Sequence, residues 1–313
     1  GLRPSRYYIT NDGYLILSSE VGALPIDESR IKVKDRLHPG KMLLVDTVKG
    51  ELIDDDKLKE QYATKQPYGE WLDNNLINLC DLKIPNKKVP THTKEERARL
   101  QKAFGYTYED FRTSILPMAL NGAESIGAMG IDTPLAVLSN RHQPLFNYFK
   151  QLFAQVTNPP IDSIREKIVT STTVYLGKDG NVLEEKPENC KNLKINNPIL
   201  TNTDLLKIKN MKVEGFKVET IPITYYKNTS IEKAIDHIFV EVDRAHREGA
   251  NIIILSDRGV DENHVAIPSL LAVGAVQHYL VQTKKRTSMA VILESGEPRD
   301  VHHFATLLGY GAS

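Results

Sequence analysis

The stretch that decides the fold lies near the end of the chain and reads Asn251-Ile252-Ile253-Ile254-Leu255. An unbroken apolar run of this length is typical of a strand that is buried on both faces, as in a parallel sheet. A second run, Met289-Ala290-Val291-Ile292-Leu293, has the same character. Between them Pro268 opens a helical pattern from Ser269 to Lys284. This alternation of strand and helix predicts an α/β fold with a parallel sheet.

Further helices are predicted upstream of these strands. Thr229-Ser230-Ile231-Glu232 can cap a helix that runs to about Glu248, and Thr93-Lys94-Glu95-Glu96 has the pattern of a capping box. From Pro144 to Val156 apolar residues recur at helical spacing, which predicts one amphipathic helix that Pro159-Pro160 ends. The part after Thr93 is shorter than the ~250 residues usual for a (β/α) barrel and is helix-rich at its start, so we expect an incomplete barrel.

The start of the chain has a different character. Residues 7–10 and 14–17 flank Asn11-Asp12-Gly13, which predicts a β-hairpin, and residues 41–46 and 51–53 read as further strands. A set of strands this small buries too little surface to form a stable domain alone, which indicates that the strands are part of a larger domain. We therefore expect a small β-rich region at residues 1–60, a linker at residues 61–92 and the main domain at residues 93–313.

Composition excludes several classes of function. The 313 residues include 40 basic and 40 acidic ones, so no net field would recruit nucleic acid or an anionic membrane surface. No stretch approaches about 18 uninterrupted apolar residues, and the start has no signal-peptide pattern, so we expect a cytoplasmic protein. Cys80 and Cys190, the two cysteines, are too few for a disulfide framework or an all-cysteine metal site.

Polar residues follow both late strands, where α/β folds build their sites. Asp257, Arg258, Glu294 and Arg299 are the candidate site residues. In the alternative interpretation the cluster is structural: Asp257 pairs with Arg258 or Arg299, and Glu294, Ser295 and Glu297 cap the next helix. His302-His303 does not have the spacing of a helical zinc site, so no metal site is expected.

Five long strings are spread over nearly the whole chain: Gly1–Tyr8, Leu37–Thr47, Ile126–Ser139, Tyr148–Asp162 and Glu294–Ala305. They resemble the glutamate synthase large subunit, the first two the end of its amidotransferase domain and the other three its central domain. The resemblance implies that residues 1–60 are a remnant of the amidotransferase domain. It also implies that residues 93–313 are a degenerate barrel related to FMN-binding barrels, which joins the glutaminase and FMN domains.

The resemblance implies an intact enzyme that hydrolyses glutamine at an amino-terminal cysteine and passes ammonia through a tunnel to 2-oxoglutarate. FMN and an iron-sulfur cluster reduce the resulting imine with electrons from ferredoxin or a pyridine-nucleotide subunit. The nucleophile lies outside a chain that begins at Gly1, and two cysteines cannot supply the three cluster ligands. We therefore expect no catalytic residue and no cofactor in this piece.

Two rival hypotheses stay open at this point. The chain could be a free-standing barrel enzyme that uses the strand-end residues, or a flavin-binding module like the related barrels. Under the glutamate synthase hypothesis, Thr157 and Asn158 are expected to face the ammonia path, because hydroxyl and amide groups exchange hydrogen bonds with ammonia without trapping it. The alternative is that these two residues only cap the preceding helix.

Overall fold

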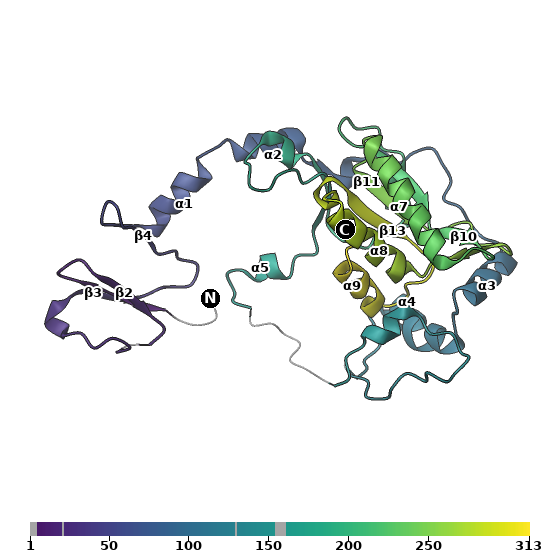
Figure 1. Cartoon of the computed structure of the whole chain (residues 1–313), viewed down its shortest axis with the longest axis horizontal. Coiled ribbons are helices and arrows are strands. Elements are labelled where there is room, and N and C mark those ends of the chain that lie inside the picture. The colour runs from purple at the N-terminus through teal and green to yellow at the C-terminus, as the bar shows by residue number, and fades with distance from the viewer. Residues whose placement is uncertain (1–4, 21, 129, 154–160) are drawn as a thin grey trace. The chain divides into compact units, whose positions relative to one another are not determined.

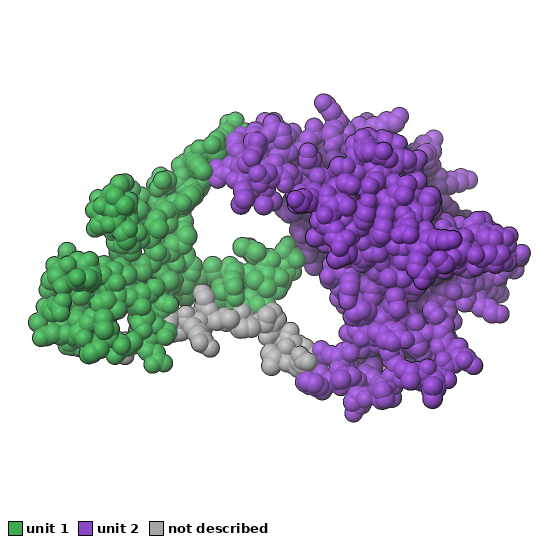
Figure 2. Space-filling model, viewed as in Figure 1, with its two compact units in different colours: residues 1–70, 156–171 green, residues 71–155, 172–313 purple. Residues whose placement is uncertain are grey.

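The computed structural model describes residues 5–20, 22–128, 130–153 and 161–313. The chain divides into two compact units, one of residues 1–70 with 156–171 and one of residues 71–155 with 172–313 (Figure 1 and Figure 2). Helix α2, Tyr68–Asn75, spans the boundary between them. In the part of the chain that the structure describes, no helix combines the length and the apolar character needed to cross a membrane.

The first unit consists of small antiparallel sheets and short helices. Its three-stranded sheet has the order β2-β1-β3, and β4 pairs with β5. The predicted hairpin is confirmed, and Gly13 adopts the positive φ of 85° that its turn requires. The elements are β1 Arg6–Thr10, β2 Leu15–Ser18, β3 Ile31–Arg36, β4 Leu44–Asp46, β5 Glu51–Ile53, α1 Asp55–Ala63 and α5 Glu166–Val169.

Little of the first unit is buried. Among its described residues only Thr10, Asp55 and Leu58 are buried, so in this part of the chain neither face of the β2-β1-β3 sheet is covered by an apolar core. Lysine side chains and a loop amide hold Asp55 in place: Lys41 and Lys59 approach it at 2.9 and 2.8 Å, and the Met42 amide donates to it at 2.8 Å. Local turns and ion pairs therefore define this unit more than apolar burial does.

The second unit is built on a three-stranded parallel sheet with the order β13-β11-β9. Its strands are β9 Val218–Pro222, β11 Ile252–Ser256 and β13 Ala290–Glu294, and the helices α7 Ile231–Arg247 and α8 Ser269–Gln282 connect them. All five residues of β11 are buried. The prediction of a parallel sheet with a strand buried on both faces is therefore confirmed.

The two faces of this sheet belong to two apolar clusters. Ile253, Leu255 and Val291 pack with α7, α8 and α9 Val301–Gly309 on one face. Ile252 and Ile254 pack on the other face with the elements α6 Asn202–Lys209, β7 Val174–Gly177 and β8 Asn192–Ile195. A short strand β6, Ile77–Asn78, completes a second sheet in the order β6-β8-β7. The central strand is thus enclosed as an unbroken apolar sequence requires.

The remaining elements of this unit are short. They include α3 Lys94–Ala103, a π-helical turn Asp110–Ile115, α4 Leu116–Asn121, and the antiparallel pair β10 Thr224–Tyr226 and β12 His264–Ala266. The predicted capping box at the start of α3 is present, with Thr93 and Glu96 bonded to each other's backbone amides. Sheets of two and three strands do not form a closed barrel in the described residues.

The amphipathic helix predicted from Pro144 to Val156 is wrong for its described part. Only a 3₁₀ turn, Leu145–Phe149, forms there, and residues 150–153 are not helical. Phe146 is fully buried against the ring of His303, with centroids 4.3 Å apart. Leu152 and Phe153 stay exposed. The periodic apolar pattern therefore reflects Leu145 and Phe146, which pack with the core, followed by the exposed Leu152 and Phe153.

Candidate site at the strand ends

The carboxyl ends of β11 and β13 meet at one edge of the parallel sheet. Ser256 and Glu294 end their strands and lie opposite each other in the register. The Ser256 hydroxyl donates to Glu294 Oε2 at 2.6 Å. Two cations reach the same carboxylate, Lys209 Nζ at 2.6 Å and Arg258 Nε at 2.5 Å. The result is a three-residue ion cluster of Lys209, Arg258 and Glu294 at the end of the sheet.

The charge on Glu294 is well stabilised. Burial acts to raise the pKa of this carboxyl, but the hydrogen bonds from Arg258, Lys209 and Ser256 outweigh it and hold the pKa below its ordinary value. The carboxylate therefore stays ionised and serves as the anchor of the ion cluster. It does not act as a proton donor near neutral pH.

Asp257 has a separate environment from its neighbour Arg258. Its carboxylate accepts hydrogen bonds from the Ser295 hydroxyl at 2.5 Å and from the Gly296 amide at 3.0 Å. Burial, together with the charges of Glu297 and Glu294, raises the pKa of Asp257 to about 6, although these two hydrogen bonds act in the opposite direction. Asp257 therefore takes up its proton at a higher pH than an ordinary aspartate does.

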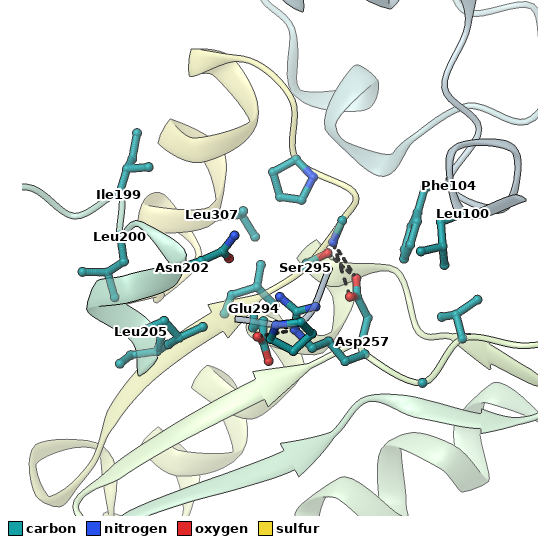
Figure 3. A pocket seen from close by; sticks show the side chains of 18 of the residues that line it. Leu100, Phe104, Ile199, Leu200, Asn202, Leu205, Asp257, Glu294, Ser295 and Leu307 are labelled. Carbon is teal, nitrogen blue, oxygen red and sulfur yellow. Dashed lines mark hydrogen bonds and ion pairs between the residues drawn. The ribbon is translucent and has the colours of Figure 1, made fainter. Parts of the chain in front are cut away.

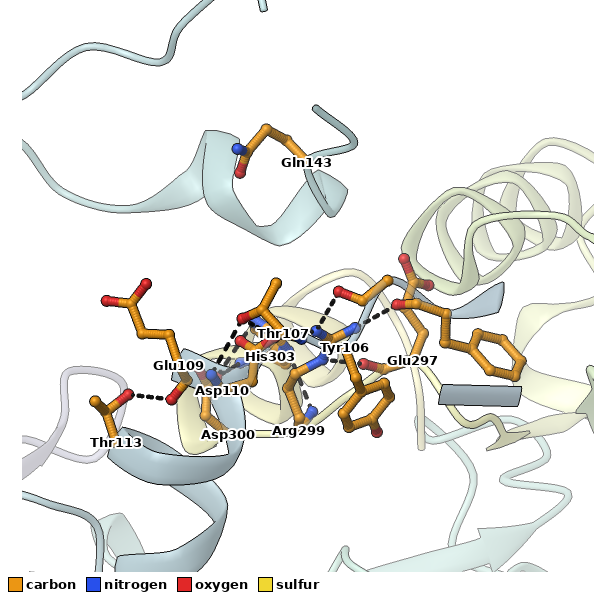
Figure 4. Close-up of polar contacts among 12 residues, drawn as sticks. Tyr106, Thr107, Glu109, Asp110, Thr113, Gln143, Glu297, Arg299, Asp300 and His303 are labelled. Carbon is orange, nitrogen blue, oxygen red and sulfur yellow. Dashed lines mark hydrogen bonds and ion pairs between the residues drawn. The ribbon is translucent and has the colours of Figure 1, made fainter. Parts of the chain in front are cut away.

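Arg299 turns away from Asp257 and acts as a buried clamp. Its guanidinium donates to the carbonyl of Phe104 at 2.5 Å and to Asp110 Oδ2 at 2.8 Å, and it stacks over the ring of Tyr106 at 3.9 Å. The Tyr106 hydroxyl in turn donates to the Gly296 carbonyl at 2.8 Å. Figure 4 shows Arg299 in the middle of this group. The clamp ties the loop after α3 to the loop after β13.

The structural interpretation of these residues was wrong in its pairings. Arg258 pairs with Glu294, and Arg299 pairs with Asp110, so neither arginine pairs with Asp257. Buried Glu297 caps the preceding helix α8 through the Ser269 amide at 2.7 Å. Asp300 caps the following helix α9. The sequence separation explains the misassignment, because the partners lie on segments that only the folded chain brings together.

Sequence reasoning missed Lys209 and Asp110 as partners. Lys209 ends α6, far from β13 in the sequence, and no local pattern marks it. Asp110 does have a local signal, because Thr107 and Asp110 bond reciprocally to each other's backbone amides like a capping box. That pattern fixes the loop that Arg299 binds.

The histidines of this region do not form a metal site. His303 is buried, and its Nδ1 accepts a hydrogen bond from the Arg299 amide at 3.2 Å. Burial lowers the pKa of His303 to about 4, so the ring is neutral near pH 7. The described ranges of the chain contain no group of three histidine, cysteine, aspartate or glutamate side chains placed to hold a metal ion.

A large cavity of about 1320 Å³ lies beside the strand ends. Figure 3 shows Asp257, Glu294 and Ser295 in the middle of the lining, with Leu200 and Leu205 on one side and Leu100 and Phe104 on the other. Arg258 also lines it, whereas Arg299 does not. The structure therefore brings three of the four candidate residues to one cavity. Thr157 and Asn158 lie outside the described residues.

Comparison with protein families gives two matches in chain order. The model of the glutamate synthase central domain matches residues 99–313, and that of class-II glutamine amidotransferases matches residues 1–71. The glutamate synthase [NADPH] large chain of Bacillus subtilis (strain 168) is 44% identical over 315 residues. The alignment covers 100% of this chain and 20% of that relative.

Two further relatives extend this result. Glutamate synthase [NADH] of Schizosaccharomyces pombe (strain 972 / ATCC 24843) is 44% identical over 325 residues, which cover 100% of this chain and 15% of the relative. Ferredoxin-dependent glutamate synthase 2 of Synechocystis sp. (strain ATCC 27184 / PCC 6803 / Kazusa) is 40% identical over 317 residues, covering 100% of this chain and 20% of the relative. The chain thus spans at most 20% of the length of these relatives. It belongs to the glutamate synthase family and corresponds to that family's central domain, preceded by the end of a class-II amidotransferase domain.

Proposed function

We propose that this chain is the connecting part of a glutamate synthase, which converts glutamine, 2-oxoglutarate and reductant into two molecules of glutamate. In this role it joins the glutaminase domain to the FMN domain and contributes to the wall of the ammonia tunnel. The observation that carries the proposal is the order of the two family matches on one polypeptide, amidotransferase first and central domain second.

The division into units supports a connecting role. Residues 156–171 fall within the range that matches the central domain, yet they belong to the same compact unit as residues 1–70, which match the amidotransferase. Ile164 of this segment lies against Gly40, where an added Cβ atom would be 3.3 Å from Ile164 Cδ1. The central-domain sequence therefore contributes a segment to the amidotransferase remnant.

We propose in addition that the second unit is a degenerate (β/α) barrel related to FMN-binding barrels. Its support is the repeated strand and helix order of β9, α7, β11, α8 and β13. The helices α7 and α8 pack on one face of the sheet, as on the outside of a barrel. The other face packs on β7, β8 and α6, which occupy the place of a barrel interior.

The residues of this chain do not fit the cofactors of the intact enzyme. Cys80 and Cys190 are free and cannot supply three thiolates to an iron-sulfur cluster. A flavin phosphate favours free amides at a helix N-terminus. At the strand ends those positions are taken by carboxylates, because Glu297 caps α8 and Asp300 caps α9. We propose that FMN and the cluster bind elsewhere in the parent enzyme, which disfavours the flavin-binding alternative.

The free-standing enzyme hypothesis loses support for a related reason. The Glu294 carboxylate accepts hydrogen bonds from Lys209, Arg258 and Ser256. The Arg299 guanidinium is bonded to the loop after α3. Asp257 has a raised pKa, but its carboxylate accepts hydrogen bonds from the Ser295 hydroxyl and the Gly296 amide and so holds the loop after β13. The proposed partners are the amidotransferase and FMN domains of the parent chain. The relatives' names include NADPH, NADH and ferredoxin, so both a pyridine-nucleotide subunit and ferredoxin are proposed electron donors.

An assay of the purified 313-residue chain tests the proposal. We expect no ammonia release from glutamine and no glutamate formation from glutamine, 2-oxoglutarate and reductant, with the parent enzyme as the positive control. Because both reactions need groups that we place elsewhere in the parent, the chain should stay inactive when FMN is added. Turnover of either reaction by the pure chain would contradict the connecting role.

A further inference from the structure

The cavity beside the strand ends has a mixed lining that the connecting role does not use. Its volume of about 1320 Å³ exceeds that of ordinary small-molecule sites, about 300–1,000 Å³. Leu100 and Phe104 form one apolar wall and Leu200 and Leu205 the opposite one, as Figure 3 shows. A short apolar group can therefore be held between two hydrophobic surfaces.

Beside Glu294 the cavity presents unused hydrogen-bond donors. Arg258 bonds to Glu294 through Nε alone, and within the described residues its two terminal nitrogens have no hydrogen-bond partner. Its side chain is 37% exposed, so the guanidinium is accessible to a ligand. Two parallel donors on one planar group match the two oxygens of a carboxylate.

The ion cluster that holds Arg258 has a net positive charge of its own. Lys209 and Arg258 carry two positive charges against the single negative charge of Glu294, so the ion cluster has an excess of +1. Asp257 directs its carboxylate to Ser295 and Gly296. Asp261, which also lines the cavity, is paired with His264 at 3.0 Å. The free donor edge thus belongs to the net positive ion cluster, whereas the wider lining also carries the carboxylates of Glu96 and Glu262.

We propose that this cavity is a binding site for a small carboxylate with a short apolar body. The carboxylate bonds to the terminal nitrogens of Arg258, and the apolar body packs between the wall of Leu200 and Leu205 and the wall of Leu100 and Phe104. Glu294, which is itself bonded to Lys209 and Ser256, holds the guanidinium through Nε without occupying its outer edge. The proposal is independent of any catalytic role for the chain.

Titration of the full 313-residue chain with hexanoate tests the proposal. By ligand-observed NMR we expect a dissociation constant of about 1 mM or tighter, because one charge-assisted pair and a short buried alkyl chain act together. Hexanol and hexylamine, which have the same apolar body, should bind at least about tenfold more weakly. Arg258→Met should weaken hexanoate about tenfold, and Arg258→Lys should retain part of the affinity.

Two further variants test the apolar wall and provide a control for the loss of a cation. Leu200→Trp adds bulk at the apolar wall without touching the ion cluster and should also weaken hexanoate. Arg247→Met removes a cation at the end of α7, outside the cavity lining, and should bind hexanoate like the original chain. The proposal is overturned if hexanoate shows no binding at a concentration about tenfold above the expected dissociation constant. It is also overturned if hexanol binds as tightly as hexanoate, or if Arg258→Met keeps the original affinity for hexanoate.

Discussion

The two sheets β2-β1-β3 and β13-β11-β9 show how differently strands of similar length can be stabilised. In the first, Leu17 of β2 is 53% exposed and no residue of β3 is buried. In the second, the whole of β11 is buried between two apolar clusters. Turn chemistry and pairing are enough to define the first sheet, whereas the second depends on packing from both sides. The contrast fits a remnant of one domain joined to the core of another.

The largest expected effect comes from opening the core of the parallel sheet. Ile254→Ala removes a fully buried side chain and should lower the free energy of unfolding by about 4 kcal/mol, from lost burial and a residual cavity. The matched change Leu17→Ala in β2 should cost less than about 1 kcal/mol, because that side chain is already half exposed. Urea denaturation followed by circular dichroism measures both. Equal losses would show that the two sheets do not differ as described.

A second comparison sets the buried clamp against a surface ion pair. Arg299→Met leaves Asp110 and the Phe104 carbonyl without their partner and should cost about 3 kcal/mol. Arg30→Met breaks a pair with Asp12 that measures 2.6 Å but is largely exposed, so the cost should stay below about 1 kcal/mol. Hydrogen exchange of the Gly105 and Tyr106 amides reports the clamp directly. Unchanged protection there in Arg299→Met would refute it.

The smallest expected effect depends on pH and concerns Asp257. Its pKa is raised to about 6 in the folded chain, so the folded state holds the proton more tightly than the unfolded state. This contribution to stability is present below about pH 4 and is lost as the pH rises through about 6. The change in stability caused by Asp257→Asn should therefore be about 2 kcal/mol more favourable at pH 7.5 than at pH 4.5. A gain that is larger at pH 4.5 would reverse the sign and contradict this assignment.

The strands with the strongest apolar sequences could be predicted from the sequence alone. Residues 251–255 and 289–293 were placed within one residue of β11 and β13, and the hairpin around Gly13 was also predicted. Strand β9 was missed, because its sequence mixes apolar, charged and hydroxyl side chains and ends at Pro222, so it contains no unbroken apolar run. An unbroken apolar run can therefore be assigned as a strand even at a sheet edge, as with β13, whereas a short strand of mixed composition cannot.

The position of the candidate site could be predicted from the sequence, but the pairing of its residues could not. The position of Asp257, Arg258 and Glu294 at the strand ends follows from the parallel arrangement. The pairing of Arg258 with Glu294 and the distant partner Lys209 depend on tertiary contacts that no local pattern encodes. Arg299 follows the same strand, yet its side chain turns to the loop after α3 because Asp110 and free carbonyls are available there.

The ammonia path of the parent enzyme is the part of the proposal that rests on Thr157 and Asn158. In the full-length enzyme, Thr157→Phe combined with Asn158→Leu should leave glutamine hydrolysis largely intact, because the nucleophile is elsewhere. Bulky apolar side chains at a tunnel wall would obstruct ammonia, which would then leak to solvent. The control is Thr170→Phe combined with Ser171→Leu, two exposed positions of the same sequence region.

The decisive measurement is the ratio of glutamate formed from 2-oxoglutarate to glutamine hydrolysed in these two variants of the parent enzyme. The connecting role predicts a ratio well below one for the Thr157 and Asn158 variant, with free ammonia accounting for the difference, and a ratio of about one for the control. If the two activities stay coupled one to one in both variants, Thr157 and Asn158 are structural residues and the assignment of this domain to the ammonia path is contradicted.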